Sequence, residues 1–533
     1  MKRILTILLA IAMLMCIAGT ASAAEGELLL SVGPQPETID PAMNSSVDGA
    51  NYLIHLSEGL FRHNWAGEGI ELALAESYEV SDDGLTWTFK LREDAKWSDG
   101  QDVVAEDFVY SWQRFVDPET AAPYAGDMGG FLLNGLAIVD GKKAPAELGV
   151  AAIDEKTLEV KLENPCAFFN EVMSFPTFFP VRKDTIEANG DAWSINPETY
   201  LSTGAYKLDK WTADEEIILV PNEFYYDVDK LVAKKLIFKL MTDPVAVLAA
   251  VRAGEIYFGI SFPPEEIPAM EAEGIYKKTA NLGTYYISMN CAKEPFNNLN
   301  VRKAFALAVD PNYIAEVVML NTVVAGGNFV GPGFVDADGT EFNSKEKVID
   351  RSDYEANKEA ARAALAEAGY PNGEGFPILE YLTNPAGSHI PIAEALAYMW
   401  KDVLNVNVTV ATQEWNVFLD ARRKGDYIIA RNGWIADFND PSNLLNLFTS
   451  YSGNNDGQYA NDAFDALMDK ANKSSDQAVR MAAMHDAERL ALGEEYVVIP
   501  IYYYANQTAV NPGLKDYTLY PTAERMFHYA YFE

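Results

Sequence analysis

A cation and an anion lie six residues apart in the segment Arg431-Asn-Gly-Trp-Ile-Ala-Asp437, at the end of a short apolar run. An arginine and an aspartate held at this separation could bind the opposite charges of a zwitterionic ligand. They could equally pair with each other, because structural ion pairs and loop aspartates are common. The segment alone leaves both interpretations open.

The elements that would position this segment follow from the apolar pattern around it. Residues 427–430 are continuously apolar, which predicts a strand buried on both faces that is interrupted from Arg431 onward. Strands and helices are predicted to alternate before it, at 285–290, 301–309, 356–368, 379–383, 390–403, 406–410 and 417–424. This alternation predicts a largely parallel α/β domain.

The preceding part of the chain has a different pattern. Apolar residues alternate at 86–91 and 158–162, which predicts a smaller antiparallel unit, with a helix at 105–114. Further strands are predicted at 27–32, 203–208, 217–220, 236–240 and 497–504, and helices at 50–60 and 245–253. A chain of 533 residues is too long for one core, so two or three compact units are expected.

The first 23 residues have the pattern of a signal peptide. Lys2 and Arg3 precede an apolar run to Cys16, and Ala21-Ser-Ala23 supplies a small-residue cleavage site. We therefore expect a periplasmic protein, with lipid anchoring through Cys16 as the alternative. No later apolar run approaches the roughly 18 residues that a membrane span needs.

Net charge and cysteine content narrow the class of protein further. The formal charge is −37, and removal of Lys2 and Arg3 makes it more negative, which argues against a nucleic-acid partner. Cys166 and Cys291 would remain after cleavage of the signal. Export permits a disulfide between them, but two separate buried thiols are equally compatible with the sequence.

Motifs of common enzymes and cofactor sites are absent from the sequence. Five histidines are scattered along the chain, without a zinc-binding His-Glu-x-x-His or paired cysteines. There is no nucleophile elbow, phosphate-binding loop or dinucleotide fingerprint. We expect neither a metal nor a cofactor, and no enzymatic activity.

Seven short motifs, in one order, carry a positive signal. Together they closely resemble the periplasmic oligopeptide-binding proteins of ABC importers, over about residues 31–507. The motifs are Glu37-Thr-Ile-Asp-Pro41, Ser57-Glu-Gly-Leu60, Leu91-Arg-Glu-Asp-Ala-Lys-Trp-Ser-Asp-Gly100, Ala105-Glu-Asp-Phe-Val-Tyr-Ser-Trp112, Thr203-Gly-Ala-Tyr206, Pro295-Phe-Asn-Asn-Leu-Asn-Val-Arg-Lys-Ala304 and Gly433-Trp-Ile-Ala-Asp-Phe-Asn439.

The resemblance implies an α/β, bilobal periplasmic-binding-protein fold of three domains with a hinged cleft between the lobes. Domain I would combine residues 24–60, 184–282 and 499–533. Domain II would be the insertion 61–183, and domain III the α/β unit 283–498. Such a protein captures short peptides in the cleft and delivers them to a membrane ABC permease, and we expect it to be a monomer.

The resemblance also implies how the ends of a peptide would be held. Asp437 stands where the family places the carboxylate that pairs with the ligand's α-amine. Arg431, Arg422 and His389 occupy positions similar to those of the family's carboxylate-binding cations. Arg422 could instead be a solvated helix charge, and His389 a loop or capping residue.

The peptide backbone would pair as an added strand between the lobes. By resemblance, one side is Asn44 with Ser45, Ser46 and Val47, and the other runs from Gly433 to Ile435, with Tyr503 nearby. Trp415, Trp434 and Tyr124 would line side-chain pockets, although a core role is the alternative for each aromatic residue. The stretch Asn44-Ser-Ser46 departs from the family pattern, which often has an acidic or larger residue there.

Other ligands and one other class of protein stay open. The same scaffold could bind dipeptides, murein peptides, nickel or a sugar. The few histidines disfavour nickel, and a sugar would not need Asp437 and Arg431. A secreted peptide hydrolase would need a nucleophile or metal site that the sequence does not show.

Overall fold

The computed structural model describes residues 26–65, 69–166 and 168–533. The predicted signal peptide and Cys16 therefore lie outside the described residues. In the part that is described, we find no helix with both the length and the apolar character to cross a membrane.

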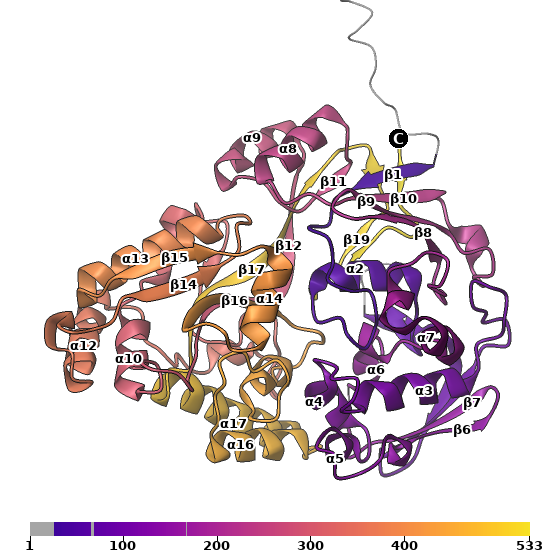
Figure 1. The fold of residues 1–533 in the computed structure, drawn as a ribbon, viewed down its shortest axis with the longest axis horizontal. Coiled ribbons are helices and arrows are strands. Elements are labelled where there is room, and N and C mark those ends of the chain that lie inside the picture. Colours follow the sequence, from indigo (N-terminus) through magenta and orange to yellow (C-terminus); the bar gives the residue numbers. More distant parts are fainter. Residues whose placement is uncertain (1–25, 66–68, 167) are drawn as a thin grey trace, which may run out of the picture.

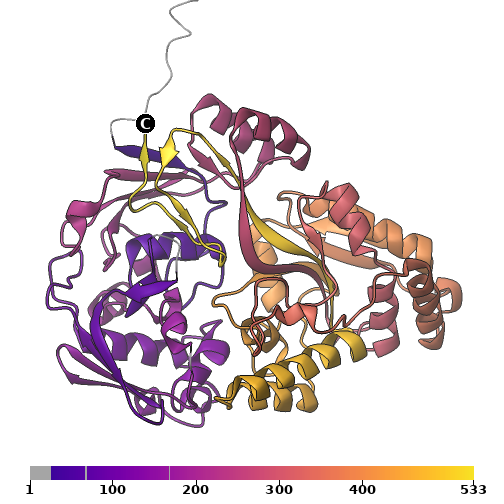
Figure 2. The same cartoon turned by 180° about the vertical axis from the view of Figure 1, so that it is seen from behind.

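Two lobes lie side by side, and two long strands run between them (Figures 1 and 2). These strands are β12 (Tyr276–Met289) and β17 (Val498–Val510), which pair antiparallel. They join one continuous sheet whose main path is β15-β14-β16-β12-β17-β11-β1-β10-β9-β8. The connection between the lobes is therefore a pair of hydrogen-bonded strands.

The outer part of this sheet in one lobe corresponds to the predicted α/β unit. Strand β14 (Leu379–Thr383) pairs parallel with β15 (Val408–Thr412) and with β16 (Ile429–Ile435). Strand β16 then pairs antiparallel with β12. The prediction of a largely parallel domain is therefore wrong at β12, which arrives from the other lobe, lies between β16 and β17, and runs antiparallel to both.

Helices of this lobe begin and end close to the predicted positions. They are α10 (Leu299–Leu307), α12 (Tyr354–Glu367), α13 (His389–Leu404) and α14 (Trp415–Arg423). Two further helices, α16 (Asp462–Asn472) and α17 (Gln477–Glu488), were not predicted from the sequence.

Strand β16 carries the segment that first suggested a binding site, and it is not interrupted at Arg431. Its pairing with β12 continues from Met289↔Ile429 to Gly283↔Ile435. Gly433 is needed inside this strand, because a Cβ there would lie 2.1 Å from the hydroxyl oxygen of Tyr504. The strand thus delivers Arg431 and Trp434 as part of the sheet.

The other lobe contains a second, antiparallel sheet of order β4-β5-β7-β6, in which β4 is Ala75–Val80, β7 is Thr157–Lys161 and β6 is Val150–Asp154. Strand β5 (Thr86–Leu91) turns Trp87, Phe89 and Leu91 inward, as the alternation predicts. Helix α3 (Ala105–Val116) buries Phe108 and Trp112 within the same core.

The remaining elements of this lobe belong to the large sheet or cover it. They include β1 (Glu27–Leu30), α2 (Val47–Leu56), β8 (Tyr206–Thr212), β9 (Glu216–Pro221), β10 (Lys235–Lys239), α8 (Pro244–Ala253) and β11 (Phe258–Gly259). Helix α2 begins and ends before the predicted 50–60, because Ser46 caps its first turn.

Three main hydrophobic clusters follow the proposed domain division. One contains buried residues between Leu282 and Tyr502. A second contains residues between Ala42 and Phe178, together with Phe438 of the opposite lobe. The third gathers residues from three distant stretches of the chain, 28–56, 181–258 and 510–530. We retain the three-domain division as a proposal that these clusters support.

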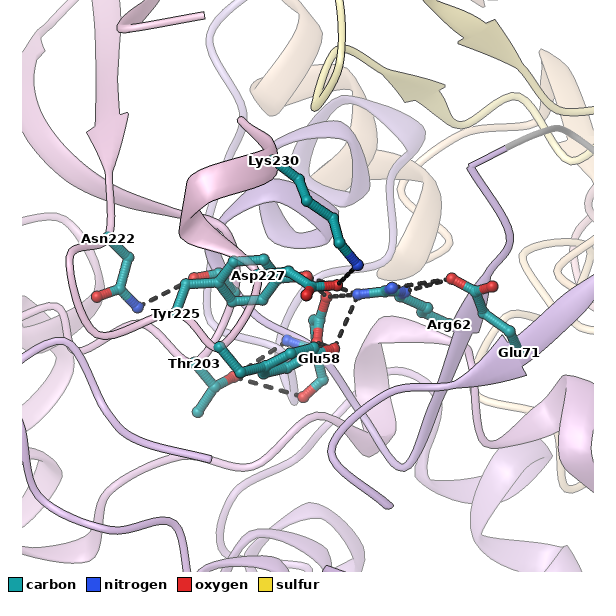
Figure 3. A network of polar contacts seen from close by, with 10 residues as sticks. Glu58, Arg62, Glu71, Thr203, Asn222, Tyr225, Asp227 and Lys230 are labelled. Carbon is teal, nitrogen blue, oxygen red and sulfur yellow. Dashed lines mark hydrogen bonds and ion pairs between the residues drawn. The ribbon is translucent and has the colours of Figure 1, made fainter. Parts of the chain in front are cut away.

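Two of the resemblance motifs meet in a buried polar network (Figure 3). The backbone N–H of Glu58 donates to Oγ1 of Thr203 at 3.0 Å. The Glu58 carboxylate pairs with Arg62 at 2.5 Å and accepts hydrogen bonds from the hydroxyls of Tyr225 and Tyr226, each at 2.7 Å. These motifs therefore join separate segments of the chain inside one lobe.

The two cysteines within the described ranges are free. Cys166 and Cys291 are half-buried and lie in different hydrophobic clusters. Burial raises the pKa of the Cys166 thiol to about 12 and that of Cys291 to about 11. Of the two possibilities that the sequence left open, the structure has separate thiols.

Candidate functional site

A cavity of about 540 Å³ lies between the lobes. Segments from the beginning, the middle and the end of the chain line it. Twelve of the thirteen predicted site residues are among its lining residues: Ser45, Ser46, Val47, Tyr124, His389, Trp415, Arg422, Arg431, Gly433, Trp434, Ile435 and Asp437. The tertiary structure therefore brings together residues that are far apart in sequence.

Asp437 is 9% exposed and hydrogen-bonded by neutral donors. Its Oδ1 accepts from the Tyr124 hydroxyl at 3.0 Å and its Oδ2 from the side-chain amide of Asn443 at 2.9 Å. Burial raises the pKa of Asp437 to about 7, although both donors oppose this rise. No cation within the described ranges forms an ion pair with it, so the carboxylate lacks a counter-ion.

Arg431 is 6% exposed and also lacks a carboxylate partner among the residues described. Its Nε donates to Oδ1 of Asn384 at 2.9 Å. Its guanidinium carbon lies 5.2 Å from the ring centroids of both Trp415 and Phe418. Arg431 and Asp437 do not pair with each other, which removes the structural ion pair that the sequence allowed.

Arg422 differs from Arg431 because it has a partner of its own. Its Nε lies 3.4 Å from Oδ2 of Asp456, and its Nη1 donates to Oδ1 of Asn432. At 9% exposure it is not the solvated helix charge that the sequence allowed. It lines the cavity with its charge already balanced.

His389 is the first residue of α13 and stacks on Tyr285, with ring centroids 5.6 Å apart. Burial, together with the nearby Arg431, lowers the pKa of His389 well below its usual value. The charged form of the ring, which its predicted role as a carboxylate-binding cation needs, is therefore disfavoured in the ligand-free site. Its buried Nδ1 has no hydrogen-bond partner among the residues described, so it can still bond to a ligand.

Strand β16 offers a free edge to the cavity. Its pairing with β14 ends at Leu382↔Ala430, whereas its pairing with β12 continues to Ile435. Gly433 and Ile435 line the cavity beyond this point. The backbone N–H of Gly433 donates to Oδ1 of Asn432 at 2.8 Å, so an extended ligand that added to β16 through main-chain hydrogen bonds would replace this bond.

The opposite wall is formed by the loop that leads into α2. Ser45, Ser46 and Val47 all line the cavity. The Ser46 side chain accepts from the backbone N–H of Gly49 at 3.3 Å, so it also caps the helix. Ser46 thus both caps helix α2 and lines the cavity.

Tyr503 is the one predicted site residue that does not line the cavity. Its hydroxyl accepts from the N–H of Asn328 and donates to the carbonyl of the same residue, both at 3.1 Å. Tyr504 lines the cavity in its place. Irregularities in the pairing of β12 with β17 at Ala280/Thr284 and Tyr285/Tyr286 prevent a simple assignment of side-chain direction from alternation.

Several cavity residues were not identified from the sequence. Asn384 lines the cavity and orients Arg431, and Asp48 and Arg525 add charged groups to the wall. Asn443 orients Asp437 from outside the lining of the cavity, and both asparagines are buried. Within the described ranges, no group of His, Cys, Asp or Glu side chains could hold a metal ion.

Direct contacts close the lobes over the cavity. The Asn454 side chain donates to Oδ2 of Asp127 at 2.9 Å, and Arg423 pairs with Glu37 at 2.6 Å. A Cβ at Gly126 would lie 2.4 Å from the carbonyl oxygen of Tyr451, so the backbones approach closely there. These contacts describe a closed arrangement of the lobes.

Comparison with known proteins supports this description. The chain is 36% identical over 507 residues to the periplasmic oligopeptide-binding protein OppA of Escherichia coli (strain K12), covering 94% of this chain and 91% of OppA. A structure of Haemophilus influenzae OppA in complex with the peptide RPPGFSPFR matches with a TM-score of 0.89 at 34% identity, covering 96% of this chain and 99% of that chain.

An unliganded open form of the murein tripeptide binding protein MppA provides a contrast. Its TM-score is only 0.63. Its sequence identity is nevertheless 32%, and the match covers 96% of this chain and 98% of the MppA chain. Since sequence identity and coverage are similar to those of the peptide complex, the lower TM-score reflects a different lobe arrangement. The structure therefore has the closed conformation.

The α/β bilobal fold predicted from the sequence is confirmed by these structural matches. Residues 69–456 match the family described as bacterial extracellular solute-binding proteins, family 5 Middle. This is a family of binding proteins and not of enzymes. The chain belongs to the bacterial extracellular solute-binding proteins of family 5.

Proposed function

We propose that this protein captures short peptides between its lobes and delivers them to an ABC-type permease. The observation that carries the proposal is a pair of unmatched buried charges: Asp437 and Arg431 line one cavity, and neither has an ion-pair partner among the residues described. A peptide provides the missing cation at its amino terminus and the missing anion at its carboxyl terminus.

The physical demand for both ligand charges is strong. A buried charge without a partner is unfavourable, and a bound ammonium next to Asp437 would offset its desolvation. Neutral Tyr124 and Asn443 already orient the carboxylate, so a ligand amine would complete its hydrogen bonding. Arg431 is oriented by Asn384 for the opposite role. The free edge of β16 would hold the backbone between them.

Peptide binding also agrees with what the relatives are named for. OppA of E. coli is named as an oligopeptide-binding protein, and the matched H. influenzae structure holds a peptide. The aromatic residues Trp415, Trp434 and Tyr124 would line side-chain pockets in which water adapts to different ligands. The protein would act without catalysis, as a monomer, and without a cofactor.

We also propose that the protein is exported from the cytoplasm. Cleavage of the signal peptide near Ala23 would release a periplasmic protein, while lipid attachment at Cys16 would leave it on the outer face of the membrane. Mass spectrometry of the protein purified from its native membrane and soluble fractions would distinguish an amino terminus at Ala24 from a lipid-modified Cys16.

Native mass spectrometry with a defined mixture of tripeptides to pentapeptides tests the function itself. We expect intact peptides bound at a ratio of one per protein, and we expect peptides that co-purify with the protein to be released by denaturation. Appearance of peptide fragments would support a hydrolase, and absence of any bound peptide would contradict the proposal.

A further inference from the structure

Two cavity residues outside the predicted site come from opposite ends of the chain. Asp48 lies in the first turn of α2, and Arg525 begins β20 (Arg525–Met526). The backbone N–H of Arg525 donates to Oδ1 of Asn51 at 3.0 Å, which holds the two elements together. Both side chains line the cavity.

The Asp48 carboxylate faces the cavity without a direct ion pair among the described residues. Its Oδ1 is placed against Gly33, where an added Cβ would lie only 2.9 Å away. Burial raises the pKa of Asp48 to about 6, and Arg525, Trp415 and Arg431 oppose this rise. The carboxylate is therefore close to cationic groups on both lobes but is not in direct contact with either guanidinium.

Arg525 is 9% exposed and is likewise without an ion pair in the described part of the chain. Its Nη1 donates to the carbonyl of Ala523 at 2.9 Å, whereas its buried Nε has no partner there. The neighbouring Glu524 also lines the cavity, but its carboxylate accepts from Thr522, lies 3.6 Å from Nε2 of His63, and forms no ion pair with Arg525 among the described residues. Arg525 thus has donor capacity that the protein does not use.

The contrast with Arg422 shows why this arrangement is unusual. Arg422 lines the same cavity but is paired with Asp456. Asp48 and Arg525 attract each other electrostatically and line the same cavity, but no ion pair joins them. A cationic group there would be repelled by Arg525 and Arg431, and an anionic group by Asp48 and Glu524. An uncharged group with both a donor and an acceptor avoids both repulsions.

We propose that Asp48 and Arg525 form a side-chain subsite that selects a ligand residue bearing a carboxamide, as glutamine and asparagine do. The amide NH₂ would donate to Asp48, and the amide carbonyl would accept from Arg525. An apolar side chain would leave both buried groups unpaired, which is how a polar site rejects an apolar analogue. This inference rests on the proposed function, because the ligand backbone must be held by the rest of the cavity.

Calorimetry with tripeptides tests the subsite. The series consists of trialanine and its variants with one glutamine, leucine, lysine or glutamate at each position in turn. At one position we expect glutamine to bind at least tenfold more tightly than leucine, lysine or glutamate. In Asp48→Ala and in Arg525→Met this preference, taken as the ratio of affinities for the glutamine and leucine peptides within each variant, should fall below threefold.

Each other outcome has a definite meaning. If trialanine and all its variants fail to bind the wild-type protein, the proposed function itself is wrong. If trialanine binds but glutamine and leucine are equivalent at every position, water satisfies Asp48 and Arg525 and the subsite is overturned. A preference for lysine or glutamate, or a glutamine preference that survives in Asp48→Ala, also overturns it. Thermal unfolding of each variant identifies misfolding, and Asp48→Ala decides the outcome if Arg525→Met does not fold.

Discussion

Two buried carboxylates in this protein have opposite surroundings. Glu58 is 2% exposed and has its own cation, Arg62, as well as the hydroxyls of Tyr225 and Tyr226 (Figure 3). Asp437 is 9% exposed and has only neutral donors, with no cation among the residues described. One network is complete within the protein, and the other lacks a positive charge.

This difference separates a structural charge from a ligand-binding one. A buried ion pair with satisfied hydrogen bonds fixes the position of the segments that carry it. A buried carboxylate with oriented neutral donors and an open side has unused capacity for a cation. Glu58 should therefore matter for folding and Asp437 for binding.

The largest effect is expected for Arg62→Leu. The substitution leaves Glu58 buried without its cation, which costs about 3 to 5 kcal/mol of unfolding free energy. Denaturant unfolding measures this loss. The double variant Arg62→Leu/Glu58→Leu is the control, because removing both charges should recover part of the stability. A stability equal to that of the wild type in Arg62→Leu would contradict the structural role of the pair.

Asp437→Asn is expected to act on binding instead. It should weaken peptide affinity by at least tenfold, about 1.4 kcal/mol or more, because the ligand ammonium loses its anionic partner. The melting temperature of the empty protein should change little, since the carboxylate has no counter-ion to lose among the described residues. Calorimetry and thermal unfolding measure the two quantities, and unchanged affinity would remove Asp437 from the site.

Blocking the ligand α-amine should reproduce this loss without changing the protein. An amino-acetylated tripeptide should bind the wild type at least tenfold more weakly than the free peptide, whereas acetylation of a lysine side chain should have little effect. Because both changes remove the same contact, acetylation of the α-amine should weaken binding to Asp437→Asn by much less. Equal binding of blocked and free peptides by the wild type would refute the amine contact.

The effect of pH on peptide affinity should be smaller than the effects of these substitutions and of acetylation, but it should have a characteristic shape. Burial raises the pKa of Asp437 to about 7 in the empty closed form, and a bound ammonium would lower it. Binding must then expel a proton as pH falls below 7, so affinity should decrease by up to about tenfold per pH unit. Above about pH 8 the ligand amine loses its own proton.

Affinity should therefore be highest between these two values, and Asp437→Asn should lose only the acidic limb. Calorimetry from pH 5 to 9 in buffers of different ionisation enthalpy measures both affinity and the protons released. An acidic limb that persists in Asp437→Asn would assign it to another group.

The motifs and most of the secondary structure could be predicted because they depend on local patterns. The alternation of apolar residues in β5 and their helical spacing in α3 predict which side chains face inward, without knowledge of the elements they pack against. The order of seven motifs indicated the family, and nearly all of the site residues that this resemblance implied do line the cavity. Strand direction in the α/β lobe was wrong, since no local pattern encodes that β16 pairs antiparallel with β12.

Only the tertiary structure decided which charges have partners. The sequence placed Arg431, Arg422 and His389 in one class, but the fold gives Arg422 a carboxylate, lowers the pKa of His389 and leaves Arg431 without an ion pair among the described residues. It also replaces Tyr503 by Tyr504 and brings Asp48 near Arg525 from the other end of the chain. The physical reason is that burial and counter-ions depend on residues distant in sequence, whereas periodicity depends only on neighbours.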